Sequence, residues 1–197
     1  MFGVNGRIKT AGPIGSGCDF EFAWNKIIPA YAFRSFYGLT SVTLPDGITT
    51  IGNYAFYYAS NLKEINIPEG VTYIGQYAFS YVYNLKHITL PESLTRITTH
   101  SFYRCEGLES VTFPETLLYI EGFAFHSNYN LLSVEFPASL VSIGDGAFAE
   151  CNKLQTVTYH GVPQVPNGHS VFTRCPKLKT FYFNGSLRQF IDTVHAI

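Results

Sequence analysis

The chain repeats itself with a period of 23 residues over most of its length. Residues 39–61, LTSVTLPDGITTIGNYAFYYASN, are followed by 23 residues of nearly the same pattern. Every copy begins with leucine, and the interval lengthens to 24 residues only before the last copy. These leucines are Leu39, Leu62, Leu85, Leu108, Leu131, Leu154 and Leu178. A fixed period of roughly 20–50 residues indicates stacked structural units rather than one globular core.

Each unit contains the pattern of a short strand that ends at a proline. The fourth and sixth positions are apolar and the fifth is polar, as in Val42, Thr43 and Leu44. This alternation predicts a half-buried strand. Proline follows in five copies, and because it lacks the N–H that a sheet ladder needs, we expect it to end the strand. Pro-Asp-Gly at 45–47 and Pro-Glu-Gly at 68–70 then predict a turn.

The second half of each unit carries apolar residues at helical spacing. Ile51, Ala55, Phe56 and Ala59 illustrate the pattern, and phenylalanine recurs at the position of Phe56 in six copies. This spacing predicts one or two helical turns, which are too short to be stable alone.

One unit is too small to fold by itself. It buries about seven apolar side chains at roughly 1.5–3 kcal/mol each. Ordering its residues costs about 1.5 kcal/mol apiece. Neighbouring units must therefore complete one another's cores and pair their strands, which then lie parallel and about 4.8 Å apart. We predict an α/β repeat solenoid with a parallel sheet on one face and short helical segments on the other.

The unit resembles a known repeat family. Its consensus, LxxVxLPxxITxIGxxAFxxC, is similar to the BspA-like, or Treponema-type, leucine-rich repeats of bacterial surface proteins. The similarity covers residues 39 to about 177, some six repeats. The more common leucine-rich repeat carries asparagine after the strand. That position here holds Gly47, Gly70, Ser93, Thr116 and Ser139, which agrees with the BspA type. The resemblance implies a leucine-rich repeat fold and a surface adhesin or ligand-binding protein without catalysis.

We expect one solenoid domain over the whole chain. Its three parts are residues 1–38 as an N-terminal edge with a degenerate repeat, 39–177 as six repeats, and 178–197 as the last strand and a capping helix.

The two ends of the solenoid carry their own patterns. Alternation over residues 18–24 predicts the strand of the degenerate repeat. The glycine-rich residues 1–17 predict a loop or short hairpin over that edge. At the other end, residues 186–195 predict the capping helix, and two prolines within 160–170 predict a distorted connection.

Charge and hydropathy exclude several classes of partner. The 197 residues carry a formal net charge of −1 and no basic run, so we expect no nucleic-acid partner. No apolar run approaches the ~18–20 residues of a membrane-spanning helix, so we expect no membrane insertion. The N-terminal residues lack the apolar stretch of a signal peptide. We expect the chain to be monomeric.

The outward-facing residues of the predicted sheet are the first candidate binding surface. The third and fifth positions present hydroxyl, amide and imidazole groups with few charges. Such groups suit hydrogen bonding to a protein or a glycan, although the same residues are also ordinary strand formers that face water. In the first four repeats they are Ser41, Thr43, Glu64, Asn66, His87, Thr89, Ser110 and Thr112.

Tyrosines on the predicted helical side form the second candidate surface. Tyr54 and Tyr77 share one repeat position, and Tyr58 and Tyr81 share another, so each pair forms a ladder. Tyrosine suits interfaces because its apolar ring carries a polar tip. The alternative is packing between neighbouring coils, and exposure of several rings together would favour a partner.

We predict neither a metal site nor a cofactor. Asp46, Glu69, Glu92 and Glu115 share one repeat position, and Ca²⁺ prefers such oxygen ligands. Long glutamate side chains can nevertheless spread into solvent, which explains the ladder without a metal.

The cysteines and histidines form no catalytic constellation. No CxxC pair indicates a zinc or redox motif. Cys151 and Cys175 occupy neighbouring copies of one position, so a disulfide between them is conceivable, although core packing explains them better. None of the six histidines pairs recognisably with a nucleophile or a carboxylate, so no catalytic residue is predicted.

The patterns leave three functional hypotheses. The leading one is a non-enzymatic binding or adhesion module that presents a rigid surface to a protein or glycan. The alternative is a structural spacer of a larger surface protein, and the third is an enzyme with its chemistry in residues 160–170. An exposed aromatic patch favours binding, a uniformly polar surface favours the spacer, and a pocket with convergent His, Glu and Ser groups favours the enzyme. The family resemblance implies an extracellular or cell-surface location.

Overall fold

The strands predicted at the fourth to sixth repeat positions form the first of two strand rows. The computed structural model describes residues 6–11, 20–22, 26–161 and 170–184. The first-row strands begin at 23-residue intervals, with 24 before the last. They are β4 (Ser41–Thr43), β6 (Glu64–Asn66), β8 (His87–Thr89), β10 (Ser110–Thr112), β12 (Ser133–Phe136), β14 (Thr156–Tyr159) and β15 (Thr180–Phe183).

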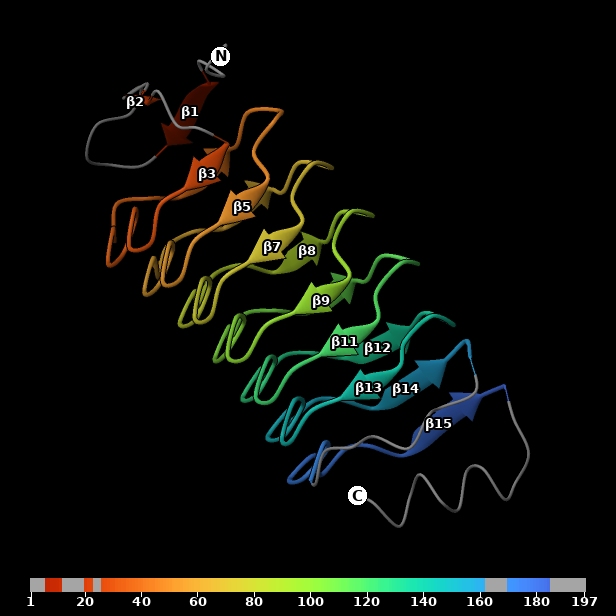
Figure 1. Ribbon diagram of the computed structural model, residues 1–197. Helices are drawn as coiled ribbons and strands as arrows, with labels where there is room; N and C mark the ends of the chain where they lie inside the picture. The colour runs from red at the N-terminus through yellow and green to blue at the C-terminus, as the bar shows by residue number, and fades with distance from the viewer. Residues whose placement is uncertain (1–5, 12–19, 23–25, 162–169, 185–197) are drawn as a thin grey trace.

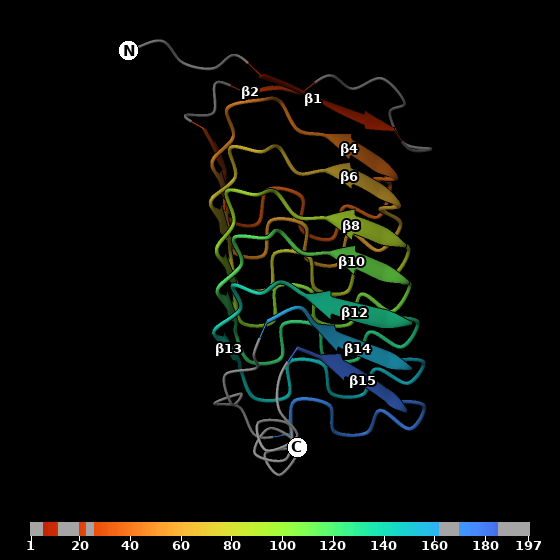
Figure 2. The ribbon, with the colours of Figure 1, turned by 90° about the vertical axis from the view of Figure 1, so that its right-hand side faces the viewer.

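These strands lie parallel and in register, as predicted. Val42 is paired with Ile65, and Val111 with Ile88. Figure 2 shows the row running in chain order from β4 to β15. The parallel sheet on one face of a solenoid is therefore confirmed.

A second parallel row was not predicted. It consists of two-residue strands that end at the recurring isoleucine, and Ile28, Ile51 and Ile74 are paired across neighbouring coils. The strands are β3 (Ile27–Ile28), β5 (Thr50–Ile51), β7 (Tyr73–Ile74), β9 (Arg96–Ile97), β11 (Tyr119–Ile120) and β13 (Ser142–Ile143). Each coil is therefore flattened, with two strands joined by a loop at one end and by turns at the other (Figure 1).

The prediction of short helical segments is wrong. Throughout the described residues, the chain after each second-row strand forms consecutive turns and no helix. Alternate N–H groups take different partners. Ala55 N donates to a carbonyl three residues back at 3.2 Å, whereas Phe56 N donates to Ala78 O in the next coil at 2.7 Å. Tyr54 and Tyr58 have φ of 59° and 61°. Left-handed residues four apart are incompatible with a right-handed helix.

The loops after β4 and β6 confirm the two predicted turns. Val71 N donates to Pro68 O at 3.0 Å, which closes the Pro-Glu-Gly segment, and Gly47 has a φ of 91°. That conformation is open to glycine because it has no Cβ.

The core lies between the two strand rows and the turns. Its spine is a ladder of phenylalanine rings, one per coil, with successive ring centroids 5.0–5.8 Å apart and planes within 23°. The rings are Phe33, Phe56, Phe79, Phe102, Phe125, Phe148 and Phe172, and each is buried. Each ring completes the core of its neighbours, which is why isolated units cannot fold.

The strand predicted for the degenerate repeat does not take a parallel place beside the first row. β2 (Phe20–Phe22) falls within the expected strand, but it pairs antiparallel with β1 (Gly6–Ala11). β1 in turn pairs antiparallel with β4 and so lies between β2 and the first row. Antiparallel neighbours need only a short connection, whereas a parallel neighbour needs a crossover. Alternation alone does not distinguish these partners.

Other terminal predictions lie outside the described residues. These are the capping helix over 186–195 and most of the irregular connection at 160–170. The division of the chain into one domain with three parts stays a prediction. No helix long and apolar enough to cross a bilayer occurs in the described part of the chain.

Candidate functional site

The eight predicted strand residues lie together on the outer face of β4, β6, β8 and β10. We refer to the outer face of the first row as the strand face. Seven of the eight are exposed, and Ser41 is half-buried. The buried residues between them, such as Val42 and Ile88, point into the core. Strand pairing sets Ser41 beside Glu64 and Thr89 beside Thr112.

Three strand-face residues also form hydrogen bonds within the solenoid. The Asn66 amide accepts a hydrogen bond from Leu44 N at 2.7 Å and donates one to Leu44 O at 3.2 Å. His87 Nδ1 lies 2.8 Å from Ser110 Oγ. Asn66 therefore continues the strand pairing beyond the end of β4, which the sequence did not indicate.

A groove of about 300 Å³ opens in the strand face between β10 and β12. Its walls carry Ser110, Ser133, Glu135 and His160, and its floor includes Phe113. Glu135 Oε2 and His160 Nε2 lie 3.6 Å apart, and their side chains are 70% and 54% exposed. We refer to this feature as the strand groove.

The strand groove contains His, Glu and Ser groups, the combination that would favour an enzyme. Nucleophilic catalysis needs a serine hydrogen-bonded to a base in a site that excludes water. Within the described residues, His160 pairs with Glu135 and Ser110 contacts His87, and all four side chains are open to solvent. The groove therefore offers exposed hydrogen-bonding groups rather than a site that excludes water.

The four predicted tyrosines lie at the other end of the coils, on the surface formed by the turns, which we refer to as the turn face. Tyr54 and Tyr77 stack with centroids 4.9 Å apart and planes within 4°. Tyr58 and Tyr81 lie 5.2 Å apart with planes tilted by 30°. All four are half-buried. Tyr57 contacts both pairs, so the rings form one cluster.

The stack of Tyr54 and Tyr77 is longer than the tyrosine ladder that was predicted. Five rings follow one another with centroids 4.6–5.1 Å apart and planes within 16°. They are Tyr31, Tyr54, Tyr77, His100 and Phe123. The end rings Tyr31 and Phe123 are 51% and 38% exposed, whereas the three inner rings are half-buried. His100 was not predicted to belong to this ladder, although it shares the repeat position of Tyr54 and Tyr77.

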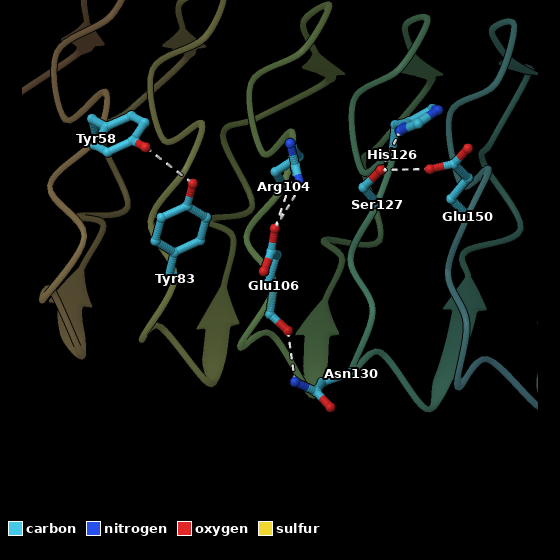
Figure 3. Close-up of polar contacts among 8 residues, drawn as sticks. All are labelled: Tyr58, Tyr83, Arg104, Glu106, His126, Ser127, Asn130 and Glu150. Atoms are coloured by element: carbon cyan, nitrogen blue, oxygen red, sulfur yellow. Dashed lines mark hydrogen bonds and ion pairs between the residues drawn. The ribbon is translucent and has the colours of Figure 1, made fainter.

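Polar contacts link neighbouring coils across the turn face (Figure 3). Tyr83 Oη donates to Tyr58 Oη at 3.4 Å, and burial together with this bond raises the pKa of Tyr83. Further along, Ser127 Oγ lies 2.7 Å from His126 Nδ1 and donates to Glu150 Oε2 at 3.2 Å. Burial lowers the pKa of His126, so the imidazole is neutral at physiological pH.

Comparison with known proteins places these features in a family. A family model for the BspA-type leucine-rich repeat region, with six copies, matches residues 26–155 and 72–195. The chain belongs to the BspA-type leucine-rich repeat family. A search of curated proteins found no match.

Solved structures similar to this BspA-type chain are bacterial leucine-rich repeat proteins. One from Bacteroides ovatus is 25% identical with a TM-score of 0.71, over 81% of this chain and 47% of that protein. A leucine-rich cell surface protein from Faecalibacterium prausnitzii is 19% identical with a TM-score of 0.47, over 84% of this chain and 65% of that one. The T. pallidum leucine-rich repeat protein is 25% identical with a TM-score of 0.48, over 78% and 71%. The chain thus spans about half the length of the B. ovatus protein.

Asp46, Glu69, Glu92 and Glu115 share one repeat position, and two of their carboxylates accept hydrogen bonds from the backbone of the next coil. Glu69 Oε2 accepts from Glu92 N at 2.9 Å, and Glu92 Oε1 accepts from Glu115 N at 3.3 Å. Among the described residues, no group of three His, Cys, Asp or Glu side chains is placed to hold a metal ion. The Glu69 and Glu92 carboxylates thus each bind a backbone N–H group of the next coil.

The three described cysteines are free thiols that pack in the core ladder. Cys105 Sγ donates to Phe79 O at 3.0 Å, and burial raises its pKa to about 12. Cys151 Sγ donates to Phe125 O at 3.4 Å and Cys175 Sγ donates to Phe148 O at 3.2 Å, and the neighbouring Cys151 lowers the pKa of Cys175. The structure therefore has a thiol pair in place of the conceivable disulfide.

A carboxylate network joins the second row to the turn face. Glu121 accepts hydrogen bonds from Thr99 N and Thr99 Oγ1, both at 2.9 Å, and from Arg96 Nη1 at 3.0 Å. Burial opposes ionisation of Glu121, but these bonds outweigh it and its pKa is lowered. The Arg96 guanidinium also lies 4.3 Å from the centroid of the Tyr119 ring.

Replacing Glu121 by glutamine is expected to cost about 1–2 kcal/mol of stability at pH 7, because charge-assisted hydrogen bonds are lost. The pKa of Glu121 is lower in the folded chain than in the unfolded chain, where it is about 4.3. Ionised Glu121 therefore stabilises the folded state fully above a pH of about 4.3, and this stabilisation is lost as the pH falls through the folded-state pKa. The difference between wild type and E121Q should therefore shrink in urea melts at pH 3. The exposed Glu64→Gln serves as control, and an equal loss there would contradict a specific role for Glu121.

Proposed function

We propose that the chain is a non-catalytic binding module that recognises a protein or glycan partner through its strand face. The observation that carries this proposal is the contrast between the two sides of the first row. From β4 to β12 the inward positions stay apolar and hold only Val, Ile, Leu or Phe, whereas the outward positions change among Ser, Thr, Glu, Asn and His. The apolar inward residues are required to pack the core, whereas the outward residues are available to contact a partner.

The rigidity of the solenoid supports this role. Strand pairing and the phenylalanine ladder hold the exposed side chains in place before a partner arrives. Binding then orders few new groups, so modest contacts add up to useful affinity. The strand groove offers an anchoring point where hydroxyl groups, Glu135 and His160 surround an apolar floor.

The family supports an extracellular or cell-surface location and a non-catalytic role. BspA-type repeats are commonly surface-associated, and the leucine-rich repeat solenoid is typically an interaction fold. We expect the partner to be neither nucleic acid nor a lipid bilayer and the chain to act as a monomer. A spacer function is the alternative, and binding assays on arrays of glycans and extracellular proteins separate the two.

Placing arginine at both Ser110 and Thr112 should abolish recognition, because two long cations would fill the strand groove and its approach. Labelled wild-type chain is first applied to a glycan array and to an array of extracellular proteins, and hits are quantified by calorimetry. The S110R/T112R variant should bind at least tenfold more weakly, with an unchanged urea midpoint.

The matched control places the same two arginines on exposed threonines outside the strand face, Thr72→Arg and Thr95→Arg. This variant should bind as wild type does. Equal losses in both variants would show that added charge, not the strand face, weakens binding. Absence of any saturable hit on either array would favour the spacer.

A further inference from the structure

The aromatic surface of the turn face ends abruptly at one coil. Three coils carry a pair of rings in the same arrangement, with centroids 5.4–5.6 Å apart: Tyr54 with Tyr57, His100 with Tyr103, and Phe123 with His126. The next coil has Gly146 and Ala149 at these two positions, and the coil after it has Ser170 and Thr173. Both rings are therefore missing in the same coil.

A hollow of about 380 Å³ lies where the missing rings would be. Phe123 and His126 stand on one side, Gly146 and Ala149 line it, and Glu150 and Arg174 also contribute. We refer to it as the ring hollow. Because it lies on the turn face, a ligand bound there would be independent of the proposed strand-face function.

Phe123 marks the aromatic wall of the ring hollow. It stacks on His100 on one side, with centroids 5.1 Å apart, and has no ring at the equivalent position on the other. It is 38% exposed, whereas His100, with rings on both sides, is half-buried. A Cβ on Gly146 would lie 2.8 Å from Phe123 Cε1, and Gly146 has a φ of +59°. The Phe123 ring thus lies directly against the Gly146 backbone, and glycine adds no side chain to the hollow.

The rim of the ring hollow supplies hydrogen-bonding groups. Arg174 Nη1 lies 2.8 Å from Glu150 Oε1, with the Arg174 side chain 77% exposed and that of Glu150 29% exposed. Ser127 donates to the other Glu150 oxygen and fixes this carboxylate (Figure 3). A ligand in the hollow would thus meet rings on one side and a fixed ion pair on another.

We propose that the ring hollow binds a small flat aromatic molecule bearing a hydroxyl or N–H group, which takes the place of the missing ring pair. Aromatic rings favour offset-stacked and edge-to-face contacts at centroid distances of about 4.5–7 Å. A flat ligand stacked on the Phe123 ring would meet the His126 ring at an inclined angle, since the two planes are 47° apart. The volume falls in the range of about 300–1,000 Å³ that is typical of small-molecule sites.

The test compares phenol with cyclohexanol, which have nearly the same size and one hydroxyl each but differ in planarity and π electrons. Each is titrated into the ¹⁵N-labelled chain, and backbone amide shifts are followed by NMR. Phenol should give saturable shifts centred on Phe123, Gly146 and Ala149 with a roughly millimolar dissociation constant, as expected for so small a ligand. Cyclohexanol should bind at least fivefold more weakly.

A variant whose new side chain fills the ring hollow tests where phenol binds. Ala149→Tyr should abolish phenol binding, because tyrosine already occupies the same repeat position at Tyr57 and Tyr103 and would fill the hollow. Arg34→Tyr makes the same kind of change at that repeat position in a distant coil and should leave binding intact. Phe123→Leu keeps an apolar residue but removes the ring, and it should weaken phenol binding at least fivefold.

Three results would overturn the proposal. They are equal binding of phenol and cyclohexanol, undiminished phenol binding by a folded A149Y variant, and shifts centred away from Phe123. If A149Y fails to show the native amide spectrum, the F123L variant and the cyclohexanol comparison still decide the matter.

Discussion

Replacing Phe102 by alanine is expected to lower the free energy of unfolding by about 3–5 kcal/mol. The ring is fully buried and stacks on Phe79 and Phe125 with centroids 5.2 and 5.1 Å away and planes within 3°. A cavity here cannot collapse easily, because the strand pairing of adjacent coils holds the walls apart. Urea denaturation followed by far-UV circular dichroism measures the effect.

The control is Phe123→Ala, which removes the same ring from the end of the turn-face stack. Phe123 is 38% exposed and stacks on one side only, so we expect a loss of about 1 kcal/mol. A loss below 1 kcal/mol in F102A, or equal losses in the two variants, would show that the phenylalanine ladder is not the spine of the core.

The second large effect is expected at Gly75, where alanine should cost about 3 kcal/mol. A Cβ at this position would lie 2.5 Å from Asn53 N and 2.6 Å from Gly52 C, which are backbone atoms of the preceding coil. Backbone atoms held by inter-coil hydrogen bonds cannot move aside as a flexible side chain can. The bond from Gly75 N to Ile51 O, 2.8 Å long, would have to stretch.

Gly122→Ala provides the matched control. A Cβ on Gly122 would have Asp145 O as its nearest neighbour, at 3.3 Å, so a small shift accommodates it. The reduced entropy of the unfolded chain offsets part of that cost, and the net change should stay within about 1 kcal/mol. A G75A variant as stable as G122A would disprove close backbone contact between these coils.

The core and the first strand row could be predicted from particular residues. The alternation of Val42, Thr43 and Leu44 assigns one face of a strand to the core, and the 23-residue interval places Ile65 beside Val42. These predictions hold because the hydrophobic effect depends on which side chains are apolar and how often they recur, and the sequence states both.

The candidate surfaces were predicted unequally well. Strand alternation was enough to bring the eight strand-face residues together, and shared repeat positions were enough to pair Tyr54 with Tyr77. The ring hollow could not be predicted in this way, because it exists where Gly146 and Ala149 carry no ring. A missing ring leaves a hollow only when the rings of the neighbouring coil, Phe123 and His126, are in place beside it.

The period, the strand register, the buried ladder and the choice of family follow from the pattern of residues alone. The assembled coils were needed to show that the apolar spacing from Ile51 onward belongs to a second strand and a ladder of turns rather than to a helix. Apolar residues point inward in both conformations, so hydrophobic spacing cannot separate them. The difference lies in the backbone: Phe56 N bonds to Ala78 O in the next coil, which requires left-handed Tyr54 and Tyr58 at a cost of about 1–2 kcal/mol each. Stacking of these rings on their neighbours offsets that cost, and such bonds exist only once the coils are assembled.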